Sequence, residues 1–153
     1  VHRDPLITTG GWHDRMAGWG PELILGTLDA FASGRLTPIP QDSQSATHAQ
    51  KLEKSEGVFD PRLPSELTLA QIHGLEPWPR CSAAVAGVRV QLRRAKMAQS
   101  GPELAGFVDE LGQFRCCDGW IQITHVQPES RKSMCFQDFA RGLACDWPQP
   151  IAK

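Results

Sequence analysis

The stretch Val88-Arg89-Val90-Gln91-Leu92-Arg93 alternates apolar and polar residues with a period of two. This pattern predicts a β-strand with one face in a core and the other in water. At Arg93 and Arg94 two polar residues are adjacent, and the apolar positions then move to Ala95 and Met97. A β-bulge near Arg93 explains this change of phase. The segment therefore predicts one long strand that bends at the bulge.

Three shorter strands are expected downstream, at 105–109, 113–117 and 120–126. Gly112 lies in the first connection between them, and Asp118-Gly119 forms the second, a strong hairpin signal. Short strands joined by tight turns, with a helix expected over 136–143, predict an α+β or mostly β fold. We expect a small, partly closed barrel with Greek-key character, of which the oligonucleotide-binding (OB) fold is one example.

Two helices are expected before the strands. The first starts near Gly10 and is predicted to break at Gly18 and Gly20. The second starts at Pro21, where the first helical turn tolerates proline, and carries an apolar stripe that includes Ile24. Gly34 is the expected C-terminal cap of this second helix.

Residues 35–64 are expected to be a linker, because four prolines interrupt them and 41–50 are polar without periodicity. Such a segment is expected to cross a surface rather than fill a core. A short helix follows from Ser65 and ends at Pro77-Trp78-Pro79. The expected organisation is 1–34 as the last helices of a truncated α/β domain, 35–64 as the linker and 65–153 as the OB-like domain.

The chain has 153 residues, a net charge of −1 and five cysteines. An odd cysteine count without a C-x-x-C spacing argues against a disulfide framework or a zinc site, and favours a reducing cytoplasm. No apolar run approaches the roughly 20 residues of a membrane span. The chain begins with Val1 rather than Met, so we expect a fragment or a processed product.

The sequence contains no recognisable catalytic motif: there is no phosphate-binding glycine loop, nucleophile elbow or H-E-x-x-H helix. In Cys116-Cys117 we expect one buried and one outward thiol, and no nucleophile. The histidines are expected to serve as surface or core residues. They are scattered along the chain at His2, His13, His48, His73 and His125. We therefore expect no catalytic, cofactor-binding or metal-binding residue in this chain.

Basic residues give the only functional pattern. Arg89 and Arg93 share the polar side of the long strand, Arg94 follows, and Arg131-Lys132 lie in a later loop. Such cations can contact RNA phosphates without reading bases, although a solubilising strand face gives the same pattern. Few aromatic residues lie nearby, so contact with the backbone of a folded RNA fits better than base stacking.

Two segments are I-H-G-L-E-P-W-P at 72–79 and V-Q-P-E-S-R-K-S-M at 126–134. They resemble I-R-A-x-N-P-W-P and L-Q-P-x-G-K-K-x-M, two motifs of the methionyl-tRNA formyltransferases. Upstream, 38–42 and 46–52 are similar to P-x-P-Q-D and A-T-Y-A-x-K-L, and 9–16 resembles the helix that closes the family's N-terminal domain. The matches run in order along nearly the whole chain.

This chain departs from those patterns in several places. His73 and Glu76 replace the family's arginine and asparagine, and Arg131 replaces a lysine. The family's I-D-W becomes Val58-Phe59-Asp60-Pro61 and loses its tryptophan, and its P-G-x-I is altered at 104–108. The changes leave the expected fold intact and affect the expected RNA affinity.

The resemblance implies an enzyme that transfers a formyl group from 10-formyltetrahydrofolate to the methionine amine of initiator tRNA. Its catalytic Asn, His and Asp would lie upstream of Val1, so this fragment is expected to be inactive alone and to hold no cofactor. The linker and barrel would help to bind the tRNA. Basic residues fall at matching family positions at Lys51, Lys54, Arg131 and Lys132, whereas Arg89, Arg93 and Arg94 come from the strand pattern.

Two other interpretations stay open. The same barrel occurs in formyltransferases that act on a nucleotide-sugar amine or on folate. The chain could also be a free-standing, non-catalytic RNA-binding module, but Leu23, Ile24 and Leu25 in the N-terminal helices need cover, which argues against it. We expect a cytoplasmic monomer whose partner is initiator methionyl-tRNA and which has no membrane association.

Overall fold

The computed structural model describes residue 4 and residues 6–152. The chain forms two compact units: residues 10–52, and residues 53–152 together with residue 4 and residues 6–9. Outside the described residues lie 1–3, 5 and 153. They include His2, the start of the predicted segment 1–34 and the end of the predicted segment 65–153. The two units are described separately below.

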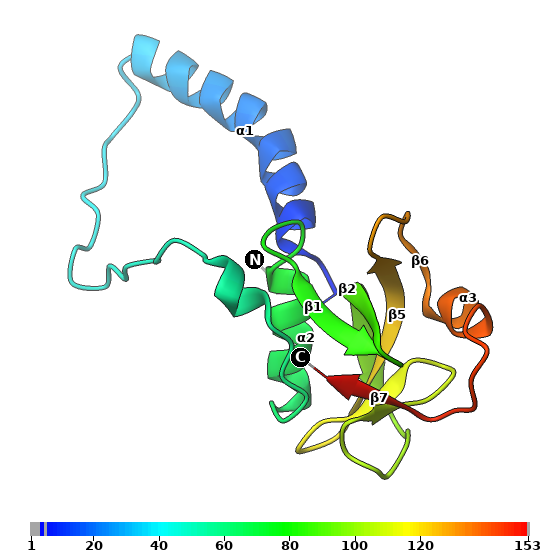
Figure 1. The fold of residues 1–153 in the computed structure, drawn as a ribbon. Helices are drawn as coiled ribbons and strands as arrows, with labels where there is room; N and C mark the ends of the chain where they lie inside the picture. The colour runs from blue at the N-terminus through cyan, green and yellow to red at the C-terminus, as the bar shows by residue number, and fades with distance from the viewer. Residues whose placement is uncertain (1–3, 5, 153) are drawn as a thin grey trace. The chain divides into compact units, whose positions relative to one another are not determined.

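One continuous helix, α1 (Thr9–Ala32), replaces the two predicted N-terminal helices (Figure 1). The predicted break at Gly18 and Gly20 is wrong, because neither glycine has a positive φ and both continue the helix. Pro21 lies inside the helix, where it lacks the N–H that would bond to the carbonyl of residue 17. The predicted cap is confirmed: Gly34 has φ 66°, and Arg35 N–H donates to the Ala30 carbonyl at 2.9 Å.

The second unit is a closed antiparallel barrel. Its six-strand ring runs β2-β1-β7-β3-β4-β5 and closes where β2 pairs with β5, while β6 pairs with the other edge of β5. The predicted small OB-like barrel is therefore confirmed. The strands are β1 (Cys81–Val85), β2 (Val88–Ala98), β3 (Phe107–Val108), β4 (Gln113–Arg115), β5 (Trp120–Pro128), β6 (Met134–Cys135) and β7 (Gln149–Ala152).

The predicted bulge in the long strand is also confirmed. The pairing of β2 with β5 shifts register on both sides of Arg94, between Leu92 and Ala95. Leu92 and Ala95 both face the core, so the bulge keeps the inner face apolar along a strand of 11 residues. Met97, expected to continue the apolar face, is 48% exposed near the end of the strand.

Helices cover the barrel at α2 (Ser65–Gly74) and α3 (Phe136–Arg141), both where the sequence predicts them. Residues 53–64 differ from the expected surface connector. They contain a 3₁₀ turn, η1 (Lys54–Gly57), followed by Phe59, which is fully buried and stacks edge-on against Phe114 at 5.3 Å. This segment packs with the barrel because its one large aromatic side chain fills the core.

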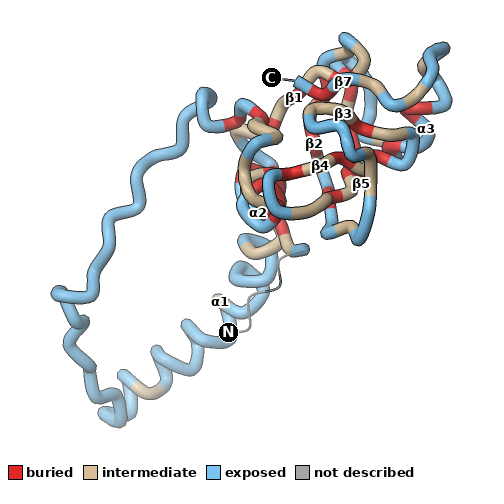
Figure 2. Tube along the Cα trace, turned by 90° about the horizontal axis from the view of Figure 1, so that it is seen from below, coloured by how far each residue is buried: buried red, intermediate tan, exposed pale blue. Residues whose placement is uncertain are grey.

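Buried residues concentrate in the barrel and α2, whereas no residue of α1 is buried (Figure 2). The division into segments 1–34, 35–64 and 65–153 stays a prediction. The largest fully buried side chains are Phe59, Phe114, Phe136, Ile72, Leu92, Ile121 and Ile123.

Candidate nucleic-acid interface

The seven predicted RNA-contact residues fall into two groups by exposure. Arg93 is partly buried, with 22% of its side chain exposed. The exposed members are Lys51, Lys54, Arg89, Arg94, Arg131 and Lys132.

A groove of about 740 Å³ brings two of these cations together. Lys54 comes from η1, and Arg89 comes from the start of β2. The turn after β5 supplies Ser130, whose φ of 60° belongs to a tight turn closed by the Arg131 N–H bond to the Pro128 carbonyl at 3.1 Å. Segments far apart in sequence thus place two exposed cations around one depression.

A smaller pocket of about 270 Å³ also has Arg89 in its lining, with Arg131 as its second cation. Arg89 therefore takes part in both depressions. The apolar part of this pocket comes from Val88, Pro128, Met134, Phe139 and Leu143. A phosphodiester chain could contact the guanidinium groups here while a sugar or base covers the apolar part.

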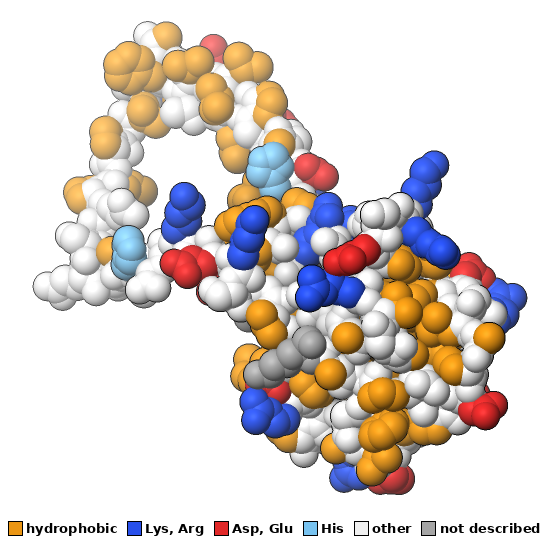
Figure 3. Space-filling view, viewed as in Figure 1, with side chains coloured by type: hydrophobic (Ala, Val, Ile, Leu, Met, Phe, Trp, Pro, Cys, Tyr) orange, Lys and Arg blue, Asp and Glu red, His pale blue; other side chains and the backbone are white. Residues whose placement is uncertain are grey.

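Acidic residues interrupt this basic surface. Arg89 lies 3.6 Å from the Glu129 carboxylate, and both side chains are at least 70% exposed. Such an exposed pair exchanges readily with solvent and contributes little to stability, so an RNA phosphate can compete for Arg89. Figure 3 shows Lys and Arg side chains interspersed with Asp and Glu over the barrel. The surface is mixed in charge, in keeping with the net charge of −1.

Arg93 has partners inside the protein. Its Nη2 lies 2.6 Å from Oε1 of Glu76, which is 10% exposed, and its Nη1 donates to the side chain of Gln127. Arg93 is the residue of β2 that has no partner on β5 at the bulge, and its side chain reaches Glu76 just after α2. Its guanidinium joins helix and barrel and is not available to RNA without breaking that ion pair.

The remaining predicted residues are more scattered. Arg94 lies on the outer face of β2, opposite His125 of β5. Lys132 follows Arg131 before β6, and Lys51 belongs to the other compact unit. Neither Arg94 nor Lys132 lines the two depressions that Arg89 shares.

Arg80 and Gln127 are among the groove residues that were not predicted to contact RNA. Arg80 is held at φ 74° by bonds from its side chain to the Pro77 carbonyl at 2.9 Å and to the Gln91 side chain at 2.8 Å. Its position just after P-W-P was the only available signal. Gln127 lies in the family-like Q-P segment, which could have drawn attention to it.

Within the described part of the chain, no group of three or more His, Cys, Asp or Glu side chains is placed to hold a metal ion. Of the two adjacent cysteines, Cys116 is buried and Cys117 is exposed, as expected. Burial raises the pKa of the Cys116 thiol, which disfavours the reactive thiolate. Among residue 4 and residues 6–152, none of the helices has the length and apolar character that a membrane span needs.

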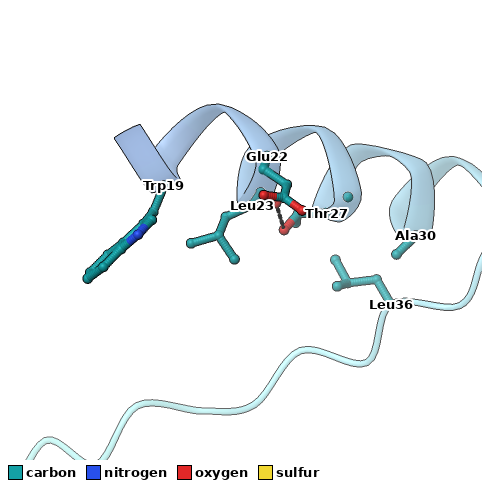
Figure 4. A pocket seen from close by; sticks show the side chains of 7 residues that line it. Trp19, Glu22, Leu23, Thr27, Ala30 and Leu36 are labelled. Atoms are coloured by element: carbon teal, nitrogen blue, oxygen red, sulfur yellow. Dashed lines mark hydrogen bonds between the residues drawn. The ribbon is translucent and has the colours of Figure 1, made fainter. Parts of the chain in front are cut away.

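The other unit presents an apolar surface on α1. Trp19 and Leu23 extend from the helix, and Leu36 of the following segment faces Ala30 (Figure 4). Leu23, Ile24 and Leu25 are 67%, 61% and 63% exposed. These three apolar side chains were expected from the sequence to require a packing partner.

Comparisons with known proteins show which family the chain resembles. The family described as "Formyl transferase, C-terminal domain" matches residues 51–144. The methionyl-tRNA formyltransferase of Rhodopseudomonas palustris is 34% identical over 149 residues, covering 95% of this chain and 48% of the relative. That of Cereibacter sphaeroides is 35% identical over 136 residues, covering 86% and 43%. The chain spans about half the length of the curated relatives it matches.

Solved structures support the fold. A HypX variant from Aquifex aeolicus aligns with a TM-score of 0.57 at 20% identity, over 83% of this chain and 27% of HypX. HypX in complex with tetrahydrofolic acid aligns with a TM-score of 0.55 at 24% identity, over 80% and 22%. The barrel, the order of its motifs and the family match over residues 51–144 lead to one assignment: this chain belongs to the formyl transferase C-terminal domain family.

Proposed function

We propose that this chain is the tRNA-contacting C-terminal part of a methionyl-tRNA formyltransferase. The enzyme would transfer a formyl group from 10-formyltetrahydrofolate to the methionine amine of initiator tRNA. The curated relatives that match most of this chain carry that name and are about twice as long. The chemistry would belong to the half of those relatives that this chain does not match, and the barrel would supply binding energy for the RNA.

One observation carries the proposed RNA contact: Arg89 lines two adjoining depressions, with Lys54 on one and Arg131 on the other. Three cations thus come from η1, the start of β2 and the turn after β5 to two depressions that share Arg89. Guanidinium and ammonium groups gathered in this way suit the phosphates of an RNA backbone. We include Arg94 and Lys132 as further contacts of the barrel, and Lys51 as a separate contact made by the other unit. We leave out Arg93 because Glu76 and Gln127 already engage it.

The tRNA is favoured over a nucleotide sugar or folate as the molecule recognised by the barrel. A small ligand is normally enclosed by a deep pocket with few polar groups. The depressions here are lined by exposed cations spread over several strands and turns, which suits an extended polyanion. The names of the curated relatives favour the same substrate.

The test is binding of the 153-residue chain to initiator tRNA, measured by fluorescence anisotropy at several salt concentrations. Affinity is expected to fall steeply with salt because phosphate contacts release counterions. Replacing Arg89 and Arg131 together by Glu should weaken binding at every salt concentration. The same change should reduce the slope of log K against log salt by about one unit for each phosphate that the variant no longer neutralises.

Arg62→Glu is the matched control, since Arg62 is exposed, pairs locally with Asp60 and does not line either depression. It should leave the tRNA affinity nearly unchanged. The control changes the net charge half as much as the double variant does. A loss of binding free energy in the control that is half that of the double variant would therefore mean that only net charge matters. No binding at low salt would refute an RNA-binding role for the chain.

A further inference from the structure

Outside the basic surface, one pair of side chains has the arrangement of a nucleophile and its base. The thiol of Cys135 on β6 lies 3.9 Å from Nε2 of His125, its register partner on β5. On the other side of the imidazole ring, Nδ1 lies 3.2 Å from the hydroxyl oxygen of Thr124. An Nδ1–H donated to Thr124 leaves Nε2 free to accept the thiol proton, and it fixes the ring for that task.

A third residue adds positive charge to this pair. Arg94 is the register partner of His125 on the opposite side, so Arg94, His125 and Cys135 form a row across β2, β5 and β6. Side chains directly opposite each other in antiparallel strands lie about 5 Å apart at Cβ. All three are exposed on the outer face of the barrel. Once His125 holds the thiol proton, its imidazolium is the cationic neighbour of the thiolate, and Arg94 adds positive charge one strand farther across the sheet.

The other four cysteines lack this combination of exposure and positive neighbours. Cys81 and Cys116 are buried, and burial raises the pKa of Cys81 to about 12. Cys117 and Cys145 are exposed, and each is followed in the sequence by an aspartate. The chain therefore contains its own controls: two thiols that are protected by burial, and two accessible thiols beside negative charge.

We propose that Cys135 is a site of reversible thiol modification that takes a low-molecular-weight disulfide, with His125 as the proton acceptor. The Cys135 proton passes to Nε2 of His125, and the thiolate sulfur attacks one sulfur of the disulfide. The S–S bond of the reagent breaks as the new S–S bond forms. Cys135 is oxidised to a mixed disulfide, and the other half of the reagent is reduced and leaves as a thiolate.

The test compares the three exposed thiols in three proteins, each retaining one of Cys117, Cys135 and Cys145 with the other two replaced by Ser. Each protein is treated with hydroxyethyl disulfide at neutral pH, and the mixed disulfide is followed by intact mass. This reagent is uncharged, so attraction of an anionic reagent to Arg94 does not enter the rate. The Cys135 protein is expected to react about ten times faster than the other two.

His125→Gln in each protein shows whether the imidazole is responsible. It should lower the Cys135 rate to about that of Cys117 and leave the Cys117 and Cys145 rates unchanged. A change in all three rates, or in the circular dichroism spectrum, would indicate a structural effect, and His125→Asn then provides an independent variant. Equal rates at the three thiols, or a Cys135 rate that neither His125 variant alters, would overturn the proposal.

Discussion

Arg93 of β2 lies 2.6 Å from Glu76, the second residue after α2, and both side chains are mostly removed from solvent. Arg93, which the strand pattern predicted to contact RNA, thus links the end of α2 to the barrel. The bulge is the physical cause, because it gives β2 one extra residue that the ladder does not use. Glu76 also lies 4.0 Å from Arg80, so the carboxylate is shared by two arginines.

The first prediction concerns that ion pair. Arg93→Met should destabilise the chain by about 3 kcal/mol, because it leaves the Glu76 carboxylate buried with its main partner removed. Urea unfolding followed by circular dichroism measures the change. Arg89→Met, which breaks the exposed pair with Glu129, should cost less than about 1 kcal/mol. Equal costs for the two variants would show that the Arg93–Glu76 pair has no special structural role.

A second prediction concerns Asp118, whose carboxylate accepts a 2.7 Å hydrogen bond from the backbone N–H of Ser65 at the start of α2. This bond, ahead of the other causes, holds the pKa of Asp118 below its ordinary range. The stabilisation is therefore complete above the ordinary pKa of about 3.9 and is lost as the pH falls through the lower folded value.

Asp118→Ala should accordingly be less stable than the parent protein at neutral pH, and the difference should shrink in acid. Asp118→Asn should recover part of the stability, since its amide oxygen can still accept the Ser65 bond. Unfolding midpoints of the three proteins across the acid range provide the measurement. Asp146→Ala serves as a control for simple removal of an exposed charge. A difference that grows toward low pH would contradict this account.

The third prediction uses two glycines with positive φ. Gly112, at φ 84°, lies where an added Cβ would collide with the Ile123 carbonyl oxygen and the Phe136 ring, whereas Gly87, at φ 76°, has open space. Gly87→Ala should cost about 1 kcal/mol from backbone strain alone. Gly112→Ala should cost about 2 kcal/mol more, because the connection must also move away from β5. Thermal and urea unfolding would show whether the two variants differ.

A fourth prediction concerns His73, a buried residue that replaces the family's arginine. Its Nε2 accepts a 3.1 Å hydrogen bond from the Ala95 N–H, just after the bulge. His73→Leu would leave that N–H without its acceptor and should destabilise the chain by about 1–3 kcal/mol. Faster hydrogen exchange of the Ala95 amide would localise the effect.

His13→Leu, a change at an exposed histidine, is the control for the removal of an imidazole and should leave the barrel's stability unchanged. Unaltered exchange at Ala95 in His73→Leu would show that the histidine bond does not protect the bulge.

The barrel strands show which elements the sequence patterns could predict. The long strand and its bulge were predicted because polar and apolar residues alternate and then change phase at Arg93. Strands β1, β6 and β7 were missed: β1 buries the small residues Cys81 and Ala83, β6 has only two residues, and β7 is short and contains Pro150. Small residues and prolines give little hydrophobic periodicity, and these strands exist because the closing barrel supplies partners for their backbone groups.

The candidate interface was also predicted only in part from the sequence. The sequence identified seven cations but could not rank them, because a residue's position on a strand does not specify its partners. Distant segments decide that question: Glu76 and Gln127 engage Arg93, while η1 and the turn after β5 bring Lys54 and Arg131 to the two depressions at Arg89.

The sequence by itself determined the family, the barrel and the bulged strand of this protein, since local periodicity, turn residues and ordered motifs are properties of neighbouring residues. The continuity of α1, the packing of Phe59 and the burial of the Arg93–Glu76 pair were decided only by the tertiary structure. So was the meeting of His125 with Cys135. The packing of Phe59 and the Arg93–Glu76 pair join residues that are distant in the sequence. The His125–Cys135 contact depends on the register of β6 against β5. No local pattern of the sequence encodes these contacts.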